Sequence, residues 1–116
     1  MRLPQGAEPL VPKAKIVEYL LAEDHPIGGR KAGFFSRFGF AIERWEDLAA
    51  ALKRHGVANP IARTIETEFG TLILVEGPIE TPDGRSPWIR SVWVHQQGQV
   101  VPRLATAYPI KRRHHG

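Results

Sequence analysis

Apolar residues in the first half of the chain recur at the spacing of α-helices. Ile16 and Leu20 lie four residues apart, the next pair repeats that spacing, and Pro12 precedes both. Residues three or four apart share one face of a helix, and proline is tolerated near a helix start. The pattern predicts a first helix over residues 13–21.

Two more helices are predicted before Pro60. Phe34, Phe35 and Phe38 share one face of the second helix, and Gly39 is placed to end it. The third helix is predicted from about Trp45 to His55, with apolar residues three and four apart and with Gly56 as its stop. His55 falls on the apolar face of its last turn, where a cation suits the helix dipole. We interpret His55 as a structural residue.

After Pro60 the periodicity changes from helical to strand-like. The predicted strands cover residues 61–69, 71–75, 88–95 and 100–109, and Thr81-Pro82-Asp83-Gly84 forms a turn between the second and the third. The continuous apolar run of residues 71–75 is typical of a strand in the middle of a sheet. The sequence therefore predicts an α+β fold, in which three N-terminal helices precede a four-stranded antiparallel meander.

The length of 116 residues is enough for one domain with a single core. We expect a single domain over residues 1–116, with an extended arm at 1–11 and a basic tail at 110–116. The chain has no cysteine, which excludes disulfides, thiol catalysis and cysteine-ligated metal sites. No apolar run is long enough for a membrane span or a signal peptide, so the expected location is the cytoplasm.

Positive charge is concentrated in the last third of the chain. Residues 84–116 hold six of the 16 basic residues and none of the 12 acidic ones. Such a segment attracts phosphate groups or an acidic protein surface. The last basic residues could equally be a solvated tail without a partner. Arg90 and Arg103 fit that reading less well, because both lie within predicted strands.

Motifs of the common enzyme classes are absent: the chain has no HExxH, P-loop, GxSxG or GxGxxG sequence and no cluster of paired carboxylates. His25 stands in a loop beside Asp24 and five residues before the basic pair Arg30-Lys31. It could cap the next helix, or it could act as a proton carrier. Histidine, arginine, lysine and tyrosine together supply what RNA cleavage needs without a metal: an acid, a base and cations for the phosphate.

Three segments of the sequence together resemble a known family. They are the pattern HPxGxxKAxFFxxxGF over residues 25–40, TPDGR over residues 81–85, and PRxxTAYP over residues 102–109. The combination resembles a bacterial domain family of unknown function and covers about residues 3–109. That family in turn resembles the toxin nucleases of the barnase, EndoU, colicin and RelE superfamily, in which N-terminal helices precede a four-stranded antiparallel sheet.

The resemblance implies a metal-independent endoribonuclease of toxin type that cleaves RNA through a 2′,3′-cyclic phosphate. It implies no cofactor and no metal, and its expected partners are RNA and an acidic antitoxin or immunity protein, with no membrane. The alternative is a non-catalytic module, either RNA-binding or protein-binding, of a toxin–antitoxin-like pair.

On this hypothesis four residues carry the reaction. His25 transfers protons, Thr106 and Tyr108 hold a phosphate by hydrogen bonds, and Arg90 on the neighbouring strand stabilises the transition state. Tyr108 could instead bury its ring and serve packing alone. Six further residues are assigned to nucleic-acid binding: Lys31, Arg85, Arg103, Lys111, Arg112 and Arg113.

Simple alternation along the last strand divides its residues between the two faces of the sheet. It predicts that Thr106 and Tyr108 face the open side together with Leu104. It places Ala105 and Ala107 toward the helices, with Arg103 at the margin of the helix layer.

Overall fold

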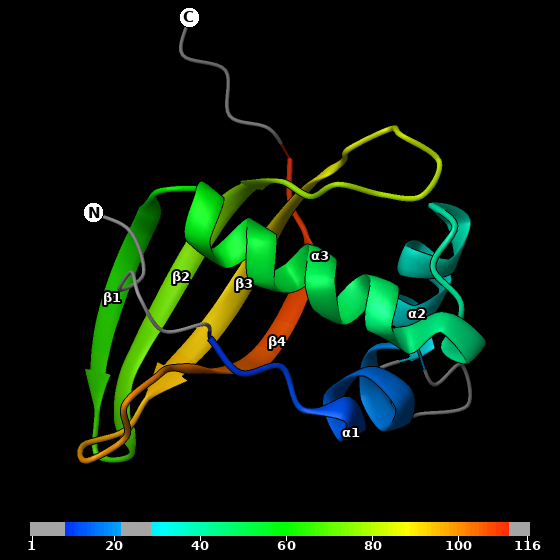
Figure 1. Ribbon diagram of the computed structural model, residues 1–116. Coiled ribbons are helices and arrows are strands. Elements are labelled where there is room, and N and C mark those ends of the chain that lie inside the picture. The colour runs from blue at the N-terminus through cyan, green and yellow to red at the C-terminus, as the bar shows by residue number, and fades with distance from the viewer. Residues whose placement is uncertain (1–8, 22–28, 112–116) are drawn as a thin grey trace, which may run out of the picture.

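The residues after Pro60 form a four-stranded antiparallel sheet (Figure 1). The computed structural model describes residues 9–21 and 29–111, without the side chains of residues 29–32. Its strands are β1 (Ile61–Thr67), β2 (Gly70–Pro78), β3 (Trp88–His95) and β4 (Arg103–Pro109). They lie in the order β1-β2-β3-β4, so each strand pairs with the next along the chain. The predicted α+β class and antiparallel meander are confirmed.

The helical segments that the structure describes are more varied than predicted. They are α1 (Lys13–Lys15), the π-helical turn η1 (Ile16–Leu20), α2 (Gly29–Arg37), the 3₁₀ turn η2 (Ile42–Arg44) and α3 (Trp45–Ala58). The first predicted helix is therefore a short α-helical turn that widens into a π turn, with the Leu21 N–H donating to the Ile16 carbonyl at 2.8 Å. Only α2 and α3 are long.

The ends of the two longer helices test the predicted stops. Gly39 follows α2 with a φ of 101°, a conformation that favours glycine, as predicted. The prediction that Gly56 ends the third helix is wrong, because α3 continues to Ala58. One glycine costs a helix only about 1 kcal/mol, whereas Pro60 disfavours helical backbone at the residue before it. Asn59 closes the helix and donates to the His55 carbonyl at 3.0 Å.

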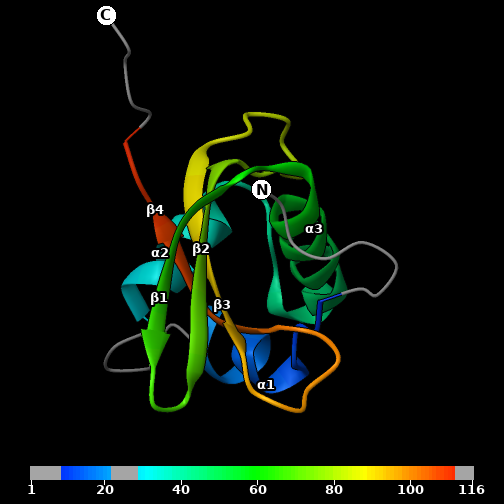
Figure 2. The ribbon, with the colours of Figure 1, turned by 90° about the vertical axis from the view of Figure 1, so that its left-hand side faces the viewer.

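The core lies between α3 and one face of the sheet, which we call the inner face (Figure 2). Its fully buried members come from both layers and from the η1 and α2 segments beside β4. The largest are Trp93, Phe35, Ile16, Leu20, Leu48, Leu52, Ile79, Ile89 and Leu104. Burial of such side chains is the main favourable contribution to folding. In the part of the chain that the structure describes, each helix is too short or too polar to span a lipid bilayer.

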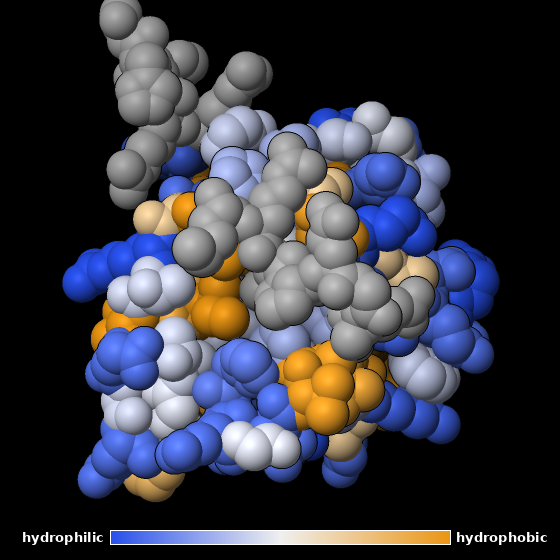
Figure 3. All heavy atoms as spheres, turned by 60° about the vertical axis from the view of Figure 1, so that its left-hand side comes forward, coloured by the Kyte–Doolittle hydropathy of each residue, from blue (hydrophilic) through white to orange (hydrophobic). Residues whose placement is uncertain are grey.

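The opposite, outer face of the sheet is only partly covered. Strand pairing places Leu72, Leu74, Val92 and Val94 on it, and all except Val92 are half-buried. Figure 3 shows the adjoining β1 edge of the sheet, seen from the side of α3, where hydrophobic patches are separated by hydrophilic residues. The predicted middle strand, β2, is indeed an interior strand, but its cover is complete on the inner face alone.

A β-bulge changes the facing of the first residues of β4. Val92 pairs with Thr106 and Trp93 pairs with Leu104, so Ala105 is an extra residue in β4. Leu104 consequently faces the core and is 1% exposed, and the prediction that it faces the open side is wrong. Arg103 pairs with Val94 and lies on the outer face, not at the margin of the helix layer. The inward position of Ala107, which is fully buried, is confirmed.

Candidate active site on the outer face of the sheet

Three neighbouring strands bring Glu76, Arg90 and Tyr108 into one cluster on the outer face. Arg90 is the direct cross-strand partner of Glu76 in β2 and of Tyr108 in β4. Its Nε donates to Glu76 Oε2 at 2.7 Å, and its Nη1 donates to the Tyr108 hydroxyl at 3.0 Å. The side chains of Arg90 and Glu76 are 26% and 12% exposed, so the pair is shielded but still reachable from solvent.

The electrostatics of the cluster keep the guanidinium charged. The hydrogen bond with Tyr108 and the interaction with Glu76 raise the pKa of Arg90 above its ordinary value, against a smaller opposing effect of burial. The Arg90 guanidinium also lies beside the Tyr108 ring, 5.6 Å from its centroid. These contacts hold the planar fork of Arg90 in one orientation above the sheet.

Thr106 extends the cluster toward the helices. It lies on the outer face two residues before Tyr108 and opposite Val92. Its Oγ1 is 3.5 Å from the hydroxyl of Tyr19, which η1 contributes. The structure thus brings Arg90, Thr106 and Tyr108 to one face of the sheet, away from α3, as the proposed site requires. Tyr108 is partly buried and hydrogen-bonded, and packing of its ring would also account for this position.

Glu76 is the member of the cluster that sequence reasoning missed. A single carboxylate does not form the paired clusters that indicate acid–base or metal chemistry in a sequence. The available signal was its position directly after the apolar run of an interior strand. A charge at that position needs a partner on a neighbouring strand, and Arg90 in the next strand provides it.

Several predicted site residues cannot be placed from the structure. His25, Arg112 and Arg113 lie outside the described residues, and so does the side chain of Lys31. Lys111 is exposed two residues after the end of β4. Arg103 is exposed on the outer face and lines a groove of about 770 Å³ together with Tyr19 and Val94. Of the residues assigned to nucleic-acid binding, Arg103 therefore lies on the same face as the cluster.

Arg85 has a structural environment of its own. Its Nε donates to Asp83 Oδ2 at 2.5 Å, and its Nη2 donates to the carbonyl of Arg37 at the end of α2. The guanidinium also stacks over Phe38, 4.3 Å from the ring centroid. The Asp83 N–H donates to the Phe38 carbonyl at 3.3 Å. The TPDGR turn therefore docks onto the C-terminal end of α2, and two of the recognised sequence segments meet in space.

His55 is buried under the inner face, as its interpretation as a structural residue requires. Its Nε2 donates to the Gly77 carbonyl at 3.1 Å, so Nδ1 of the neutral ring accepts from the Ser91 hydroxyl at 2.8 Å. Trp93 Nε1 in turn donates to Ser91 Oγ at 2.9 Å. Burial lowers the pKa of His55, although hydrogen bonds with the backbone of Gly77 and Ile89 oppose this effect. The ring is thus held neutral. The favourable interaction between a cationic His55 and the helix dipole, which the sequence suggested, is therefore absent.

Comparison with known proteins places the chain in a family. A family model described as "Domain of unknown function (DUF6883)" matches residues 2–111. The chain belongs to this family. The resemblance to a bacterial domain family of unknown function is confirmed to that extent, and no curated protein matches the chain.

The fold is shared with a solved structure. A chain of the contact-dependent growth inhibition toxin–immunity protein complex from Klebsiella pneumoniae 342 superposes with a TM-score of 0.69. The match covers 87% of this member of the family and 99% of that chain, at 17% sequence identity. At this identity the likeness shows the fold. Within the described ranges, no three histidine, aspartate or glutamate side chains group in a way that could hold a metal ion.

Proposed function

We propose that this domain is a metal-independent endoribonuclease of toxin type, which cleaves RNA by internal transfer of the phosphate to the 2′-oxygen. The observation that carries the proposal is the Glu76–Arg90–Tyr108 cluster on the outer face of the sheet. The shared fold with a chain of a toxin–immunity protein complex supports the toxin assignment. The product would be a 2′,3′-cyclic phosphate.

The cluster offers the groups that bind a phosphate. Arg90 uses Nε and Nη2 toward one oxygen of Glu76 and Nη1 toward Tyr108, so a further N–H of each Nη can point toward a ligand above the sheet. The Tyr108 and Thr106 hydroxyls lie on the same face and can donate to phosphoryl oxygens. Charge-assisted hydrogen bonds of this kind are the strong ones in phosphate recognition.

Glu76 and His25 are assigned the proton transfers. In the proposed step the 2′-oxygen attacks phosphorus while the Glu76 carboxylate accepts the proton of the 2′-hydroxyl. The bond from phosphorus to the 5′-oxygen then breaks, and His25 as imidazolium gives its proton to that oxygen. A histidine suits this exchange at neutral pH because its ordinary pKa is about 6.5.

The Glu76–Arg90 pair stabilises the transition state more strongly than the bound substrate. Before the reaction, the carboxylate offsets the charge of the guanidinium that it contacts. When Glu76 takes up the proton, its negative charge disappears as charge accumulates on the phosphoryl oxygens. Arg90 then faces the transition state without a competing anion. An interaction that strengthens only in the transition state raises the rate of the chemical step.

The test is incubation of the purified protein with total RNA in EDTA, followed by analysis of the 3′ ends. We expect cyclic phosphates from the parent protein. Arg90→Gln and Glu76→Gln are expected to lower the cleavage rate at least ~100-fold, in the range found for removal of a charge-stabilising or proton-transferring group. Intact RNA at micromolar parent protein would refute the enzyme and would favour the non-catalytic module.

A matched control is available on the other side of the molecule. Arg54 and Glu80 form an exposed ion pair at 3.3 Å, with side chains 53% and 74% exposed. Arg54→Gln and Glu80→Gln remove the same charges away from the outer face, and we expect cleavage at the parent rate. Equal losses from both pairs would show that net charge, and not the cluster, governs the activity.

The proposed partner is an acidic antitoxin or immunity protein. The solved relative in fold is part of a toxin–immunity protein complex, which motivates this assignment. Co-expression with a small acidic protein encoded beside this chain should allow higher yield than expression alone, and the two should co-purify. Free expression of active protein without any partner would contradict a toxin.

A further inference from the structure

An exposed phenylalanine stands in the turn between β1 and β2. Phe69 is 71% exposed. Its N–H donates to Thr67 Oγ1 at 3.1 Å, and the Thr67 hydroxyl donates to the Gly70 carbonyl at 2.7 Å. Gly70 has a φ of 126°, and a Cβ there would lie 2.7 Å from the His95 carbonyl oxygen. The turn is thus closed by its own hydrogen bonds and rests against the end of β3, which fixes the backbone position of Phe69.

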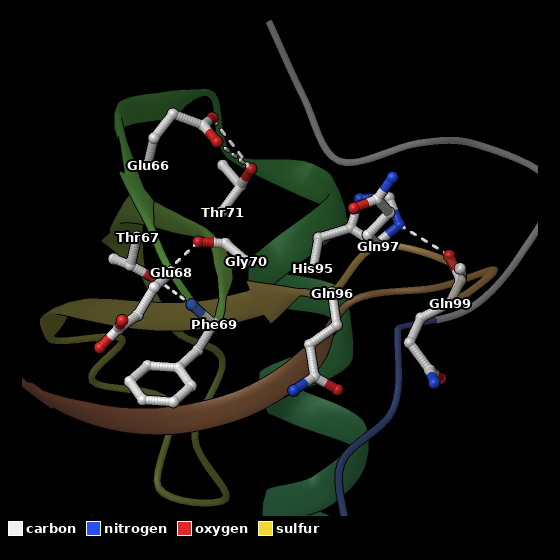
Figure 4. Close-up of a pocket in the computed structure, with 11 residues that line it drawn as sticks. Glu66, Thr67, Glu68, Phe69, Gly70, Thr71, His95, Gln96, Gln97 and Gln99 are labelled. Atoms are coloured by element: carbon white, nitrogen blue, oxygen red, sulfur yellow. Dashed lines mark hydrogen bonds between the residues drawn. The ribbon is translucent and has the colours of Figure 1, made fainter.

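Two hollows meet at this ring. One is a polar cup of about 740 Å³, lined by the β1–β2 turn and by the residues that follow β3. The other is the groove of about 770 Å³ that also holds Tyr19 and Arg103. Phe69 and Gln96 line both. In the close-up, the Phe69 ring and the Gln96 amide extend from their two segments in the same direction (Figure 4).

The two hollows differ in charge. Glu66 and Glu68 line the cup, where they oppose the approach of a phosphate. Lys15 and Arg103 line the groove, against the single acid Glu18. These charges favour a neutral group beside Phe69 and Gln96 and an attached phosphate in the groove.

We infer that Phe69 and Gln96 bind an unpaired nucleobase of the RNA strand, with the adjoining phosphate on the Arg103 side. Single-stranded RNA is recognised by stacking of bases on aromatic rings and by hydrogen bonds to their edges. The exposed ring supplies the stacking surface, and the amide of Gln96 can both donate and accept. This inference rests on the proposed function, because it assigns that site a part of its substrate.

The base site is continuous with the proposed catalytic cluster but separate from it. Val94, which lines the groove, lies four residues along β3 from Arg90 on the same face. At a rise of about 3.3 Å per residue this separation is ~13 Å. Tyr19 lines the groove and also contacts Thr106. The base bound at Phe69 is therefore not the one at the cleaved bond but one further along the strand.

The test measures binding of an RNA dodecamer that cannot be cleaved, because each 2′-hydroxyl is replaced by 2′-O-methyl, with 2-aminopurine scanned along it. Phe69→Ala is expected to weaken binding about 5-fold to 100-fold, the range of a single base–aromatic stack. Phe69→Trp is expected to keep the parent affinity. At one probe position the parent and Phe69→Trp should quench 2-aminopurine fluorescence, and Phe69→Ala should not.

Val100→Ala is the matched control, because Val100 is an 83% exposed apolar side chain that lines neither hollow. Equal affinity of Phe69→Ala and the parent protein, or an equal loss in Val100→Ala, would overturn the inference. An absence of RNA binding by the parent protein would also overturn it and would assign the hollows to a protein partner. Binding that depends on Phe69, without cleavage of unmodified RNA, would support the base site while refuting the enzyme.

Discussion

The Trp93–Ser91–His55 network shows how one buried polar residue is accommodated in the core. His55 is 2% exposed, and both ring nitrogens have hydrogen-bond partners. Through these two hydrogen bonds, the buried imidazole links α3 to β2 and β3. Loss of either partner would leave a buried polar group without a hydrogen bond, which costs about 1–3 kcal/mol.

The lowered pKa of His55 predicts how stability depends on pH. Above pH ~6.5 the ring is neutral in both the folded and the unfolded chain, so the free energy of unfolding is unaffected. As the pH falls below this value, the unfolded chain takes up a proton that the folded chain resists, and stability decreases until the folded pKa is reached. Urea unfolding at pH 7.5 and 5.5 should show this loss, and His55→Gln should reduce it. An equal decrease in the free energy of unfolding in the parent protein and in His55→Gln would contradict the assignment of this pH dependence to His55.

Individual residues of the candidate site could be proposed from the sequence where a residue type alone indicates chemistry. Arg90, Thr106 and Tyr108 stood out because they belong to strands in a basic, acid-free segment. Glu76 did not, since its significance depends on the register between β2 and β3, which places it opposite Arg90. Register is set by pairing over the whole strand and by turn geometry, and neither is visible at a single position.

Among the structural elements, the turn at residues 81–85 is defined by geometry more than by charge. Arg85 combines an ion pair with Asp83, a bond to the Arg37 carbonyl and a stack on Phe38. A lysine at position 85 keeps the charge, but it loses the stacking on Phe38 and the planar guanidinium that makes both hydrogen bonds. We therefore expect Arg85→Lys and Arg85→Ala to lower the melting temperature by similar amounts, about 2–5 °C. The measurement is a thermal melt of each variant, and full retention by Arg85→Lys would show that charge alone matters.

The helices and strands themselves were largely predictable, but the face of the sheet on which individual side chains lie was not. Alternating and helical patterns gave the sheet, its order and the two longer helices, because each pattern reflects a local periodicity. The facing of Arg103 and Leu104 was inverted by the extra residue Ala105. A bulge depends on how two strands pair, and the sequence of β4 alone contains no periodicity that reveals it.

At the scale of the whole molecule, the charge asymmetry of the sequence is partly cancelled by folding. Arg85 is paired with Asp83 and Arg90 with Glu76, both acids from outside the basic segment. Arg103, Lys111, Arg112 and Arg113 are the remaining cations of residues 84–116. Attraction of RNA over a distance should therefore depend mainly on these four.

Salt dependence of RNA binding tests this distribution. Each phosphate neutralised on a single strand adds about 0.7 to the slope of log affinity against log salt concentration. Three or four contacts predict a slope of about −2 to −3, measured by fluorescence anisotropy between 50 and 300 mM salt. After deletion of residues 112–116, the slope should still have a magnitude of at least about 0.7, which corresponds to one neutralised phosphate. A slope that disappears on deletion would mean that the folded sheet contributes nothing.

The bulge at Ala105 also constrains how this domain can be recombined with other members of its family. It sets the phase between the two parts of β4: Thr106 and Tyr108 follow one alternation, and Arg103 follows the other. A chimera that keeps all of residues 103–106 but pairs β4 with β3 without the bulge would turn Arg103 toward the core and Leu104 toward solvent. Crossover points outside β4 preserve this phase, so such exchanges should be made in the segments that flank the strand.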